Sequence, residues 1–515
     1  MQHLKAIRFV SSFCILFSGA AMAQQPGSSL TLTIDTRKTY QTIDNFGASD
    51  AWAAQFAGNW PDAKKNEIAD WLFSLDTTAN GQPKGIGLSM WRFNLGAGST
   101  QQGAASGIRD EWRRAESFLD SNGNYNWTRQ AAQQWFLKAA QQRGVKSFLA
   151  FYNSPPVPYT KNGKAFAGVK GVSNIEPSKY EAFADYTVQS IKGLQRHAGI
   201  RFDYLSPINE PQWDWSDGGQ EGCPYTNEEI AAVVKVLSAK MKKAGLSTKL
   251  LIAEAGHLKY LLKDDDKPGK GNQLADLFDP KSAHYVGGLP LVAPVIAGHS
   301  YFSTSPFATG VALRKELADK VAAVRGLTFW QSEYCILGDN DGEISGNRKD
   351  TGMRSALYVA RTIHTDLAVA NAAAWQWWLS ISAYNYKDGL IYIDKNKTDG
   401  NYSDSKMLWA LGNYSRFVRP GMQRVEASLP GAPATLLVSA YRKSKSNEVV
   451  VVLVNTGKEP QSIGVQAITG KASRPVKQVV AYTTSATEKL APQRVVGSLT
   501  IQPETIVTLV SDLNL

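Results

Sequence analysis

The stretch Ser206-Pro207-Ile208-Asn209-Glu210-Pro211 stands at the end of a short apolar run that begins at Tyr204. Its length and pattern predict a buried β-strand over residues 204–210 that ends by presenting a glutamate. A second such run, Thr328-Phe329-Trp330-Gln331-Ser332-Glu333-Tyr334, presents another glutamate. Two carboxyl groups at the ends of different strands could act together only in a fold that brings these strand ends close to each other.

The remaining strand candidates are spaced far apart, and helical patterns separate them. The predicted strands are residues 42–49, 87–96, 146–154, 204–210, 249–255, 295–302, 327–334 and 373–379. Predicted helices include 61–75, which has Pro in its first turn, 129–143 and 227–244, which Gly closes, and 177–197. Eight β-then-α units predict a (β/α)8 barrel, whose sites are built at the C-terminal ends of the strands.

The chain changes character after about Arg419. Short β-branched runs at 435–442, 448–454, 476–482, 495–501 and 506–510 predict an antiparallel β-sandwich. Near the other end, Leu30, Leu32 and Ile34 alternate with polar residues, which predicts a half-buried strand that is a candidate partner for this sheet. The predicted domains are thus residues 42–418, the catalytic barrel, and a side β-domain built from 24–41 and 419–515. Of the 14 Trp residues the last is Trp409, so the side domain is interpreted as structural.

The first residues predict export. Lys5 and Arg8 precede an apolar run over 9–17, and Ala21-Met22-Ala23 fits a cleavage site after Ala23. Residues 1–23 are therefore predicted to be a signal peptide, and the protein to be secreted or periplasmic. No apolar run is long enough for a membrane span. The formal net charge of +11 comes from scattered basic residues without basic runs, so no nucleic-acid binding is expected. The protein is expected to be a monomer.

Two cysteines remain after the predicted cleavage. Cys223 lies in the loop after Glu210, and Cys335 stands two residues past Glu333, so both are expected on one rim. An exported protein permits a disulfide between them, and two unpaired thiols are the alternative. Neither cysteine has a His at ligand spacing, so no metal and no cofactor are expected.

The two glutamates suggest a reaction. Glu210 ends the fourth predicted strand and Glu333 the seventh, and these strands face each other across a barrel. Retaining glycoside cleavage uses two carboxyl groups about 5–5.5 Å apart, one as acid/base and one as nucleophile. Glu210 is the candidate acid/base, Glu333 the candidate nucleophile, and Asn209 a candidate ligand of the sugar 2-hydroxyl. The alternative is that both glutamates are solvated loop acids.

Other polar residues on predicted strands are candidates for the same site. Arg92 lies within the second strand, where a charge is costly unless it is paired, and it would hold Glu333 ionised; an ion pair outside the barrel is the alternative. His299 and Tyr301 are two apart and point the same way. Tyr301 is the better candidate to hydrogen-bond the nucleophile, and His299 is either a site residue or a barrel-core histidine.

Aromatic residues crowd the predicted strand ends, where sugar rings would pack on them. The candidate platforms are Trp213, Trp375 and Trp378, and core packing is the alternative for each. Trp377 is expected to turn away from Trp378, because adjacent strand residues face opposite sides of a sheet.

Five motifs together resemble glycoside hydrolase family 30 of clan A. They are Gln41-Thr42-Ile43-Asp44-Asn45-Phe46-Gly47-Ala48-Ser49, the Arg92 strand, Asn153-Ser154-Pro155-Pro156, Asn209-Glu210-Pro211-Gln212 and Ser332-Glu333. The resemblance implies a retaining mechanism, a side β-domain assembled from both chain ends, and a substrate-binding role for Asn153. Asn153-Ser154-Pro155-Pro156 together with Gln220-Glu221-Gly222-Cys223 looks most similar to the endo-β-1,6-galactanase branch.

The expected function is therefore that of a secreted retaining β-glycoside hydrolase acting on a polysaccharide or oligosaccharide, with β-1,6-galactan as the leading substrate. Other activities of the family are alternatives: β-1,6-glucanase, xylanase, β-xylosidase and glucosylceramidase. A catalytically weak carbohydrate-binding protein and a transglycosylase would use the same fold.

Overall fold

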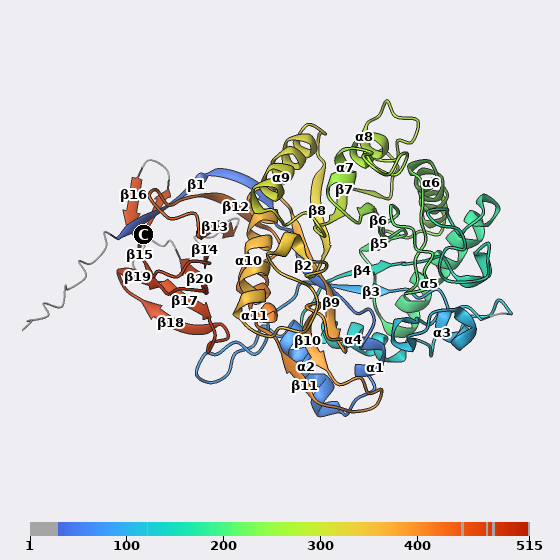
Figure 1. Cartoon of the computed structure of the whole chain (residues 1–515), viewed down its shortest axis with the longest axis horizontal. Coiled ribbons are helices and arrows are strands. Elements are labelled where there is room, and N and C mark those ends of the chain that lie inside the picture. The colour runs from blue at the N-terminus through green and yellow to red at the C-terminus, as the bar shows by residue number, and fades with distance from the viewer. Residues whose placement is uncertain (1–28, 121, 444–447, 470–471, 476–478, 513–515) are drawn as a thin grey trace, which may run out of the picture.

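The chain forms two β-sheets that lie side by side, one closed and one open (Figure 1). The computed structural model describes residues 29–120, 122–443, 448–469, 472–475 and 479–512, so the predicted signal peptide lies outside the described residues. Within the described residues, no helix combines the length and the apolar character that crossing a bilayer requires.

The closed sheet is a barrel of parallel strands in sequential order, as predicted. Strand β9 pairs with both β8 and β2, which closes the ring. The strands are β2 (Asn45–Ser49), β3 (Met90–Asn94), β4 (Ser147–Phe151), β5 (Tyr204–Ser206), β6 (Lys249–Ala255), β7 (Val292–His299), β8 (Thr328–Tyr334) and β9 (Ala374–Ser382). Beyond β9 the sheet continues into two strands that the sequence did not predict, β10 (Gly389–Ile393) and β11 (Tyr402–Asp404).

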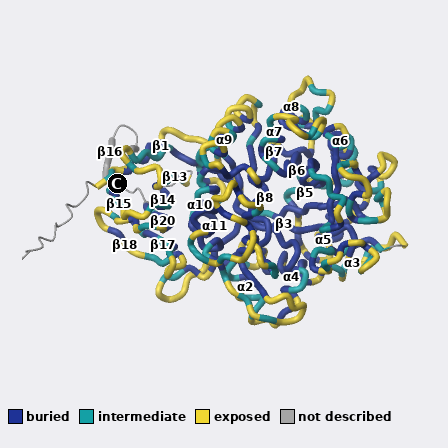
Figure 2. The backbone as a smooth tube through the Cα atoms, in the orientation of Figure 1, coloured by how far each residue is buried: buried dark blue, intermediate teal, exposed yellow. Residues whose placement is uncertain are grey.

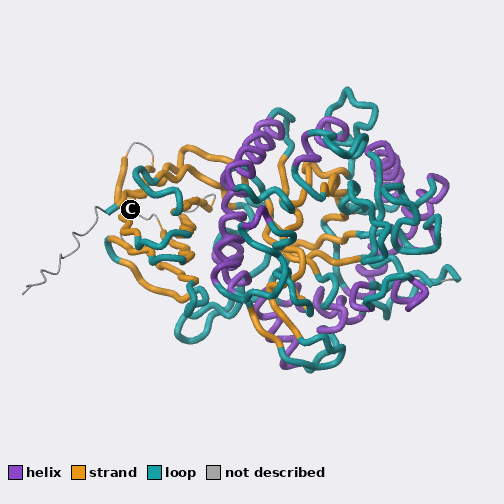
Figure 3. The backbone as a smooth tube through the Cα atoms, in the orientation of Figure 1, coloured by secondary structure: helices purple, strands orange, loops and turns teal. Residues whose placement is uncertain are grey.

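Helices surround the barrel on its outside (Figure 3). Their bounds are α1 (Ala54–Ala57), α2 (Asp62–Phe73), α3 (Ser99–Gln102), α4 (Ala131–Gln142), α5 (Tyr180–Ala198), α6 (Asn227–Lys243), α7 (Lys259–Leu262), α8 (Gln273–Phe278), α9 (Phe307–Ala322), α10 (Met353–Ala368) and α11 (Lys406–Ser415). Local sequence fixes several ends. Thr226 and Glu229 form a reciprocal capping box at the start of α6. Gly199, with φ 73°, ends α5 in the left-handed conformation that glycine adopts without strain.

The open sheet joins both ends of the described chain. Its strands are β1 (Leu30–Thr42), β12 (Met422–Ser428), β13 (Leu436–Lys443), β14 (Glu448–Asn455), β15 (Gln461–Thr469), β16 (Ala472–Pro475), β17 (Val479–Thr484), β18 (Ala491–Val495), β19 (Ser498–Ile501) and β20 (Thr505–Asp512). Strand β1 runs antiparallel to β12 and parallel to β15, so the predicted pairing of the first strand with the C-terminal sheet is confirmed. We propose the domain division predicted from the sequence, since the chain leaves this sheet after β1 and re-enters it at β12.

The core fills the barrel and the layer between its strands and helices (Figure 2). Helices α10 and α11 stand between the barrel and the open sheet, and both contact strand β20. The side chain of Asn413 on α11 and that of Thr508 on β20 hydrogen-bond at 3.0 Å. These contacts tie the open sheet to the barrel wall.

Candidate active site

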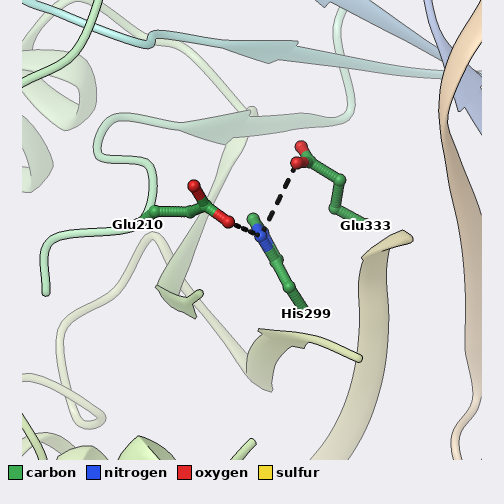
Figure 4. A group of neighbouring side chains, drawn as sticks. All are labelled: Glu210, His299 and Glu333. Atoms are coloured by element: carbon green, nitrogen blue, oxygen red, sulfur yellow. Dashed lines mark hydrogen bonds and ion pairs between the residues drawn. The ribbon is translucent and has the colours of Figure 1, made fainter. Parts of the chain in front are cut away.

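Glu210 and Glu333 meet at the C-terminal mouth of the barrel, as predicted from their places at the ends of the fourth and seventh barrel strands. Glu333 lies within β8, and Glu210 lies in the loop after β5 with φ 43°. One carboxylate oxygen of each, and a ring nitrogen of His299, all lie within 4.8 Å of one another. Figure 4 shows the three side chains converging from their separate backbones. The two acids are 7% and 3% exposed, so they are not solvated loop acids.

Two donors hold the Glu333 carboxylate. Arg92 Nη1 lies 3.0 Å from Oε2, and the Tyr301 hydroxyl donates to Oε1 at 3.1 Å. Arg92 is fully buried and lies over the ring of Phe151, with 4.6 Å between the guanidinium carbon and the ring centroid. Burial raises the pKa of Glu333, while the positive charges of His299 and Arg92 oppose that rise. The contacts predicted for Arg92 and Tyr301 are thus present.

His299 is a site residue that joins three carboxyl groups. Its Nδ1 lies 2.9 Å from Glu210 Oε1 and 3.7 Å from Glu333 Oε1, and its Nε2 lies 3.1 Å from Glu254 Oε2. Burial alone lowers the pKa of an imidazole, but the three surrounding carboxylates outweigh it and raise the pKa of His299 to about 10. The ring is therefore an imidazolium at neutral pH.

The same three side chains are of types that bind metal ions, and their ligand atoms are close enough to share one. Both ring nitrogens of His299 are engaged by carboxylates, however, and an imidazolium has no lone pair to offer a metal. We therefore interpret Glu210, His299 and Glu333 as a hydrogen-bonded ion cluster.

Glu254 belongs to this cluster, and the sequence analysis missed it. It lies near the end of β6, it is fully buried, and it accepts hydrogen bonds from His299 and from the Ser332 hydroxyl. A single acid within the apolar run Leu250-Leu251-Ile252-Ala253-Glu254-Ala255 was the available signal. It is the same signal that singled out Arg92, namely a charge inside a buried strand.

Asn209 and Asn153 both lie at the barrel mouth and are each 4% exposed. Among the described protein atoms, neither side-chain oxygen has a hydrogen-bond partner. A buried amide oxygen without a partner is costly, so each is available to accept a hydrogen bond from a bound hydroxyl group.

Trp213 is half-buried beside the acid. Its ring meets Phe302 edge-on, with 6.1 Å between the ring centroids, and Phe302 is 48% exposed. A Cβ on Gly256 would lie 2.3 Å from Trp213 Nε1 and 3.2 Å from Glu210 Oε1, so the absent side chain lets the indole approach the carboxyl group. Trp213 therefore lies beside the Glu210 carboxyl group, and its role as a sugar platform stays a prediction.

Trp378 forms a second aromatic wall together with Trp52, a residue that the sequence analysis missed. The two rings meet edge-on at 5.4 Å, and Trp378 also meets Phe151, whose ring lies under Arg92. Trp52 follows β2, so the available signal was an aromatic residue three positions past the end of the first barrel strand.

The prediction that Trp375 is a sugar platform is wrong. Trp375 is fully buried, and its Nε1 donates to Asp366 of α10 at 2.9 Å, on the helix side of the barrel. Trp377 also points away, with Nε1 donating to the Asp388 carbonyl, as predicted. Trp375 and Trp377 are two apart on one strand and share a face, so the argument that turned Trp377 away applied equally to Trp375.

The predicted disulfide is also absent, because Cys223 and Cys335 are both free and buried. The Cys223 thiol accepts from the backbone N–H of Asn174 at 3.3 Å, and the Cys335 thiol lies 3.9 Å from the Tyr301 hydroxyl. The two thiols therefore contact different segments of the chain. Their positions in the sequence predict which loops carry them but not the directions in which their side chains point. Burial raises the pKa of Cys223 to about 11, so it is an inert thiol.

Comparison with known proteins places this arrangement among glycosidases. The model of the family described as O-Glycosyl hydrolase family 30 matches residues 29–392. An endo-beta-1,6-galactanase of Hypocrea rufa is 25% identical over 455 residues, covering 85% of this chain and 84% of the relative. The crystal structure of a conserved exported protein from Bacteroides fragilis is 34% identical, with a TM-score of 0.85 over 93% of this chain and 100% of that one. The catalytic domain of GH30 xylanase C from Talaromyces cellulolyticus shares the fold, at 22% identity and a TM-score of 0.66 over 93% of this chain and 99% of that one.

Proposed function

Because this chain belongs to O-glycosyl hydrolase family 30, we propose that it is a secreted enzyme that hydrolyses β-glycosidic bonds of a polysaccharide with retention of configuration. The observation that carries the proposal is the separation of the two acids: their nearest ligand oxygens lie within 4.8 Å of each other. Inverting enzymes need about 6.5–9.5 Å between the carboxyl groups to admit a water molecule, and retaining enzymes about 5–5.5 Å.

The reaction would proceed in two displacements. A Glu333 oxygen attacks the anomeric carbon, the glycosidic bond breaks, and the proton of Glu210 moves to the leaving oxygen. Water then attacks the anomeric carbon on the face opposite its bond to Glu333. Glu210 takes the proton from this water, and the bond between the sugar and Glu333 breaks.

The charges in the cluster suit these roles. The three carboxyl groups of Glu210, Glu254 and Glu333 face two cations, Arg92 and the His299 imidazolium. A buried cluster of this composition is neutral only when one carboxyl group carries a proton, and burial favours neutrality. Arg92 and Tyr301 hold the Glu333 carboxylate for attack, and the proposed acid role requires that Glu210 supply the proton.

The substrate proposed is a polysaccharide with β-1,6-linked galactose. Its support is the resemblance to the galactanase branch in Asn153 and in the loop around Glu221, together with the galactanase relative. In the structure Glu221 is buried and accepts from the Ala97 N–H at 2.9 Å and from the Ser99 N–H at 3.2 Å. The loop motif thus fixes the segment that follows β3, which forms one side of the barrel mouth.

The test is digestion of a matched panel of β-1,6-galactan, β-1,6-glucan, xylan and a chromogenic β-glycoside, with the Glu333→Gln protein as background. Proton NMR early in the reaction should show the β-anomer first, since two inversions give retention. Short galactose oligomers are the expected products, and faster release from glucan or xylan would replace the substrate assignment. Binding without hydrolysis would indicate a carbohydrate-binding protein, and longer products with added acceptor a transglycosylase.

Export has a separate test. The full chain, produced in a cell with a general secretion pathway, should appear outside the cytoplasm with Gln24 as its first residue. If the protein stayed in the cytoplasm with residues 1–23 still attached, export would be contradicted, and the hydrolysis proposal would stand.

A further inference from the structure

Glu254 is a buried charge that the two-carboxylate reaction does not use. Its side chain is fully buried, it accepts from His299 Nε2 at 3.1 Å and from the Ser332 hydroxyl, and its other oxygen has no partner among the described protein atoms. A buried carboxylate is costly unless a cation faces it. Here burial pushes the pKa of Glu254 upward, but the hydrogen bond and charge of His299 bring it below its usual range.

The backbone at Glu254 is shaped to aim this carboxylate inward. Ala253 and Glu254 have φ values of 86° and 47°, and the pairing of β6 with β7 shifts register between Ala253 and Ala255. Such irregularities redirect a side chain, and non-glycine residues in these conformations are strained unless the surrounding structure holds them. The Glu254 carbonyl also accepts from the Glu210 N–H at 3.0 Å. One residue therefore holds the acid loop through its backbone and His299 through its side chain.

We propose that Glu254 is a positioning residue of the reaction: it holds the His299 ring as an imidazolium between Glu210 and Glu333, and so sets the pH window in which one acid is charged and the other protonated. The proposal deepens the function proposed above and rests on it. Glu254 itself touches no reacting atom, since His299 stands between it and both acids.

The direction of the effect follows from the charges around His299. The charged and polar groups around His299 and its carboxylate partners come from three strands and two loops. They are Arg92 on β3, Glu210 after β5, Glu254 on β6, Tyr301 after β7, and Ser332 and Glu333 on β8. Removing the negative charge of Glu254 makes every nearby proton easier to lose. The pKa of His299 falls, and both limbs of the pH profile move to lower pH.

The experiment compares Glu254→Gln, Glu254→Asp and a control, Glu229→Gln. Glu229 is a half-buried glutamate of the capping box at the start of α6, which a glutamine also completes, and no contact joins it to Glu210, His299 or Glu333 in the described structure. For each protein we would measure the pH dependence of kcat/KM. Independently of turnover, we would titrate the His299 ring by NMR with ¹⁵N-histidine, identifying its signals by their loss in His299→Gln.

In Glu254→Gln the His299 pKa and the alkaline limb of kcat/KM should fall by about one unit or more, the size expected for losing one adjacent charge. Glu254→Asp keeps the charge, so it should recover most of the wild-type His299 pKa, and Glu229→Gln should change neither that pKa nor the alkaline limb. Unchanged titration of His299 in Glu254→Gln, with a lower kcat alone, would reduce Glu254 to a packing residue. If the wild-type protein hydrolysed no glycoside, the function would fail while the NMR titration still decided the role of Glu254.

Discussion

Arg92 and Glu333 form an ion pair inside the barrel mouth, with 3.0 Å between Nη1 and Oε2 and side chains that are 0% and 4% exposed. Such a pair is worth little as a source of stability, because removing two charges from water is costly. Removing only one partner is strongly destabilising, because the remaining charge stays buried without a partner. The pair therefore makes the proposed nucleophile and the stability of the fold depend on one residue.

Arg92→Met should lower the free energy of unfolding by about 3–5 kcal/mol, the loss seen when one partner of a buried pair is removed. Turnover should fall as well, because Glu333 then gains a proton more readily. Denaturant unfolding and kcat measure the two effects. Arg361→Met is the control: it breaks the more exposed pair with Glu343 and should cost only about 0–1 kcal/mol. Equal losses in both variants would contradict the burial argument.

Glu333→Gln should abolish nearly all turnover on unactivated substrate while oligosaccharide still binds, since the amide keeps the shape and removes the nucleophile. Initial rates and isothermal titration calorimetry separate the two properties. Substantial residual hydrolysis would assign the nucleophile elsewhere.

Glu210→Ala should lose about 10²- to 10⁴-fold on a polysaccharide, the usual contribution of general acid catalysis. On an aryl glycoside with a good leaving group the loss of bond cleavage should be much smaller, because the departing oxygen needs little protonation. Comparing kcat/KM on the two substrates checks this. An identical loss on both would argue against the acid role.

Asp50 gives stability a pH dependence. It is fully buried after β2, and burial raises its pKa to about 8, from an ordinary value of 3.8. A raised folded pKa contributes stability below pH 4 that is lost as the pH rises through 8. Melting temperatures at pH 5 and pH 8 should therefore differ less in Asp50→Asn than in the wild type. The same difference in both proteins would show that Asp50 is ionised in the fold.

Both thiols should be alkylated after denaturation without reductant, because Cys223 and Cys335 form no bridge. In the native protein both should resist alkylation, since burial keeps each pKa high. Mass spectrometry distinguishes the states. If the denatured protein took up no alkylating agent and its mass were two hydrogens below that of the reduced chain, the two cysteines would form a disulfide after all.

The barrel and the acid pair were predictable because each depends on pattern and order along the chain. Strand spacing gave the ring of strands, and Glu210 and Glu333 follow from where strands end. Arg92 was predictable because a charge in a buried strand needs a partner. Each of these predictions can be made without knowing the direction in which a side chain points.

The missed or mistaken residues depend on direction. Trp375 and Trp378 differ by three positions, so they lie on opposite faces of one strand, and counting along it was enough to separate them. Glu254 was harder, because the shift of register at Ala253 rotates its side chain out of simple alternation. Cys223 and Cys335 lie in loops, where sequence gives no orientation.

The pairing of β1 with β12 and β15 has a consequence for how the protein is made. Strand β1 is synthesised long before its partners β12 and β15, and β9, which closes the barrel against β2, is synthesised before both of them. The barrel can therefore assemble before the side sheet, and until then β1 is an unpaired edge open to wrong partners. A nascent chain that is released after β9 but before β12 should therefore contain a closed barrel and a strand β1 that lacks these two partners.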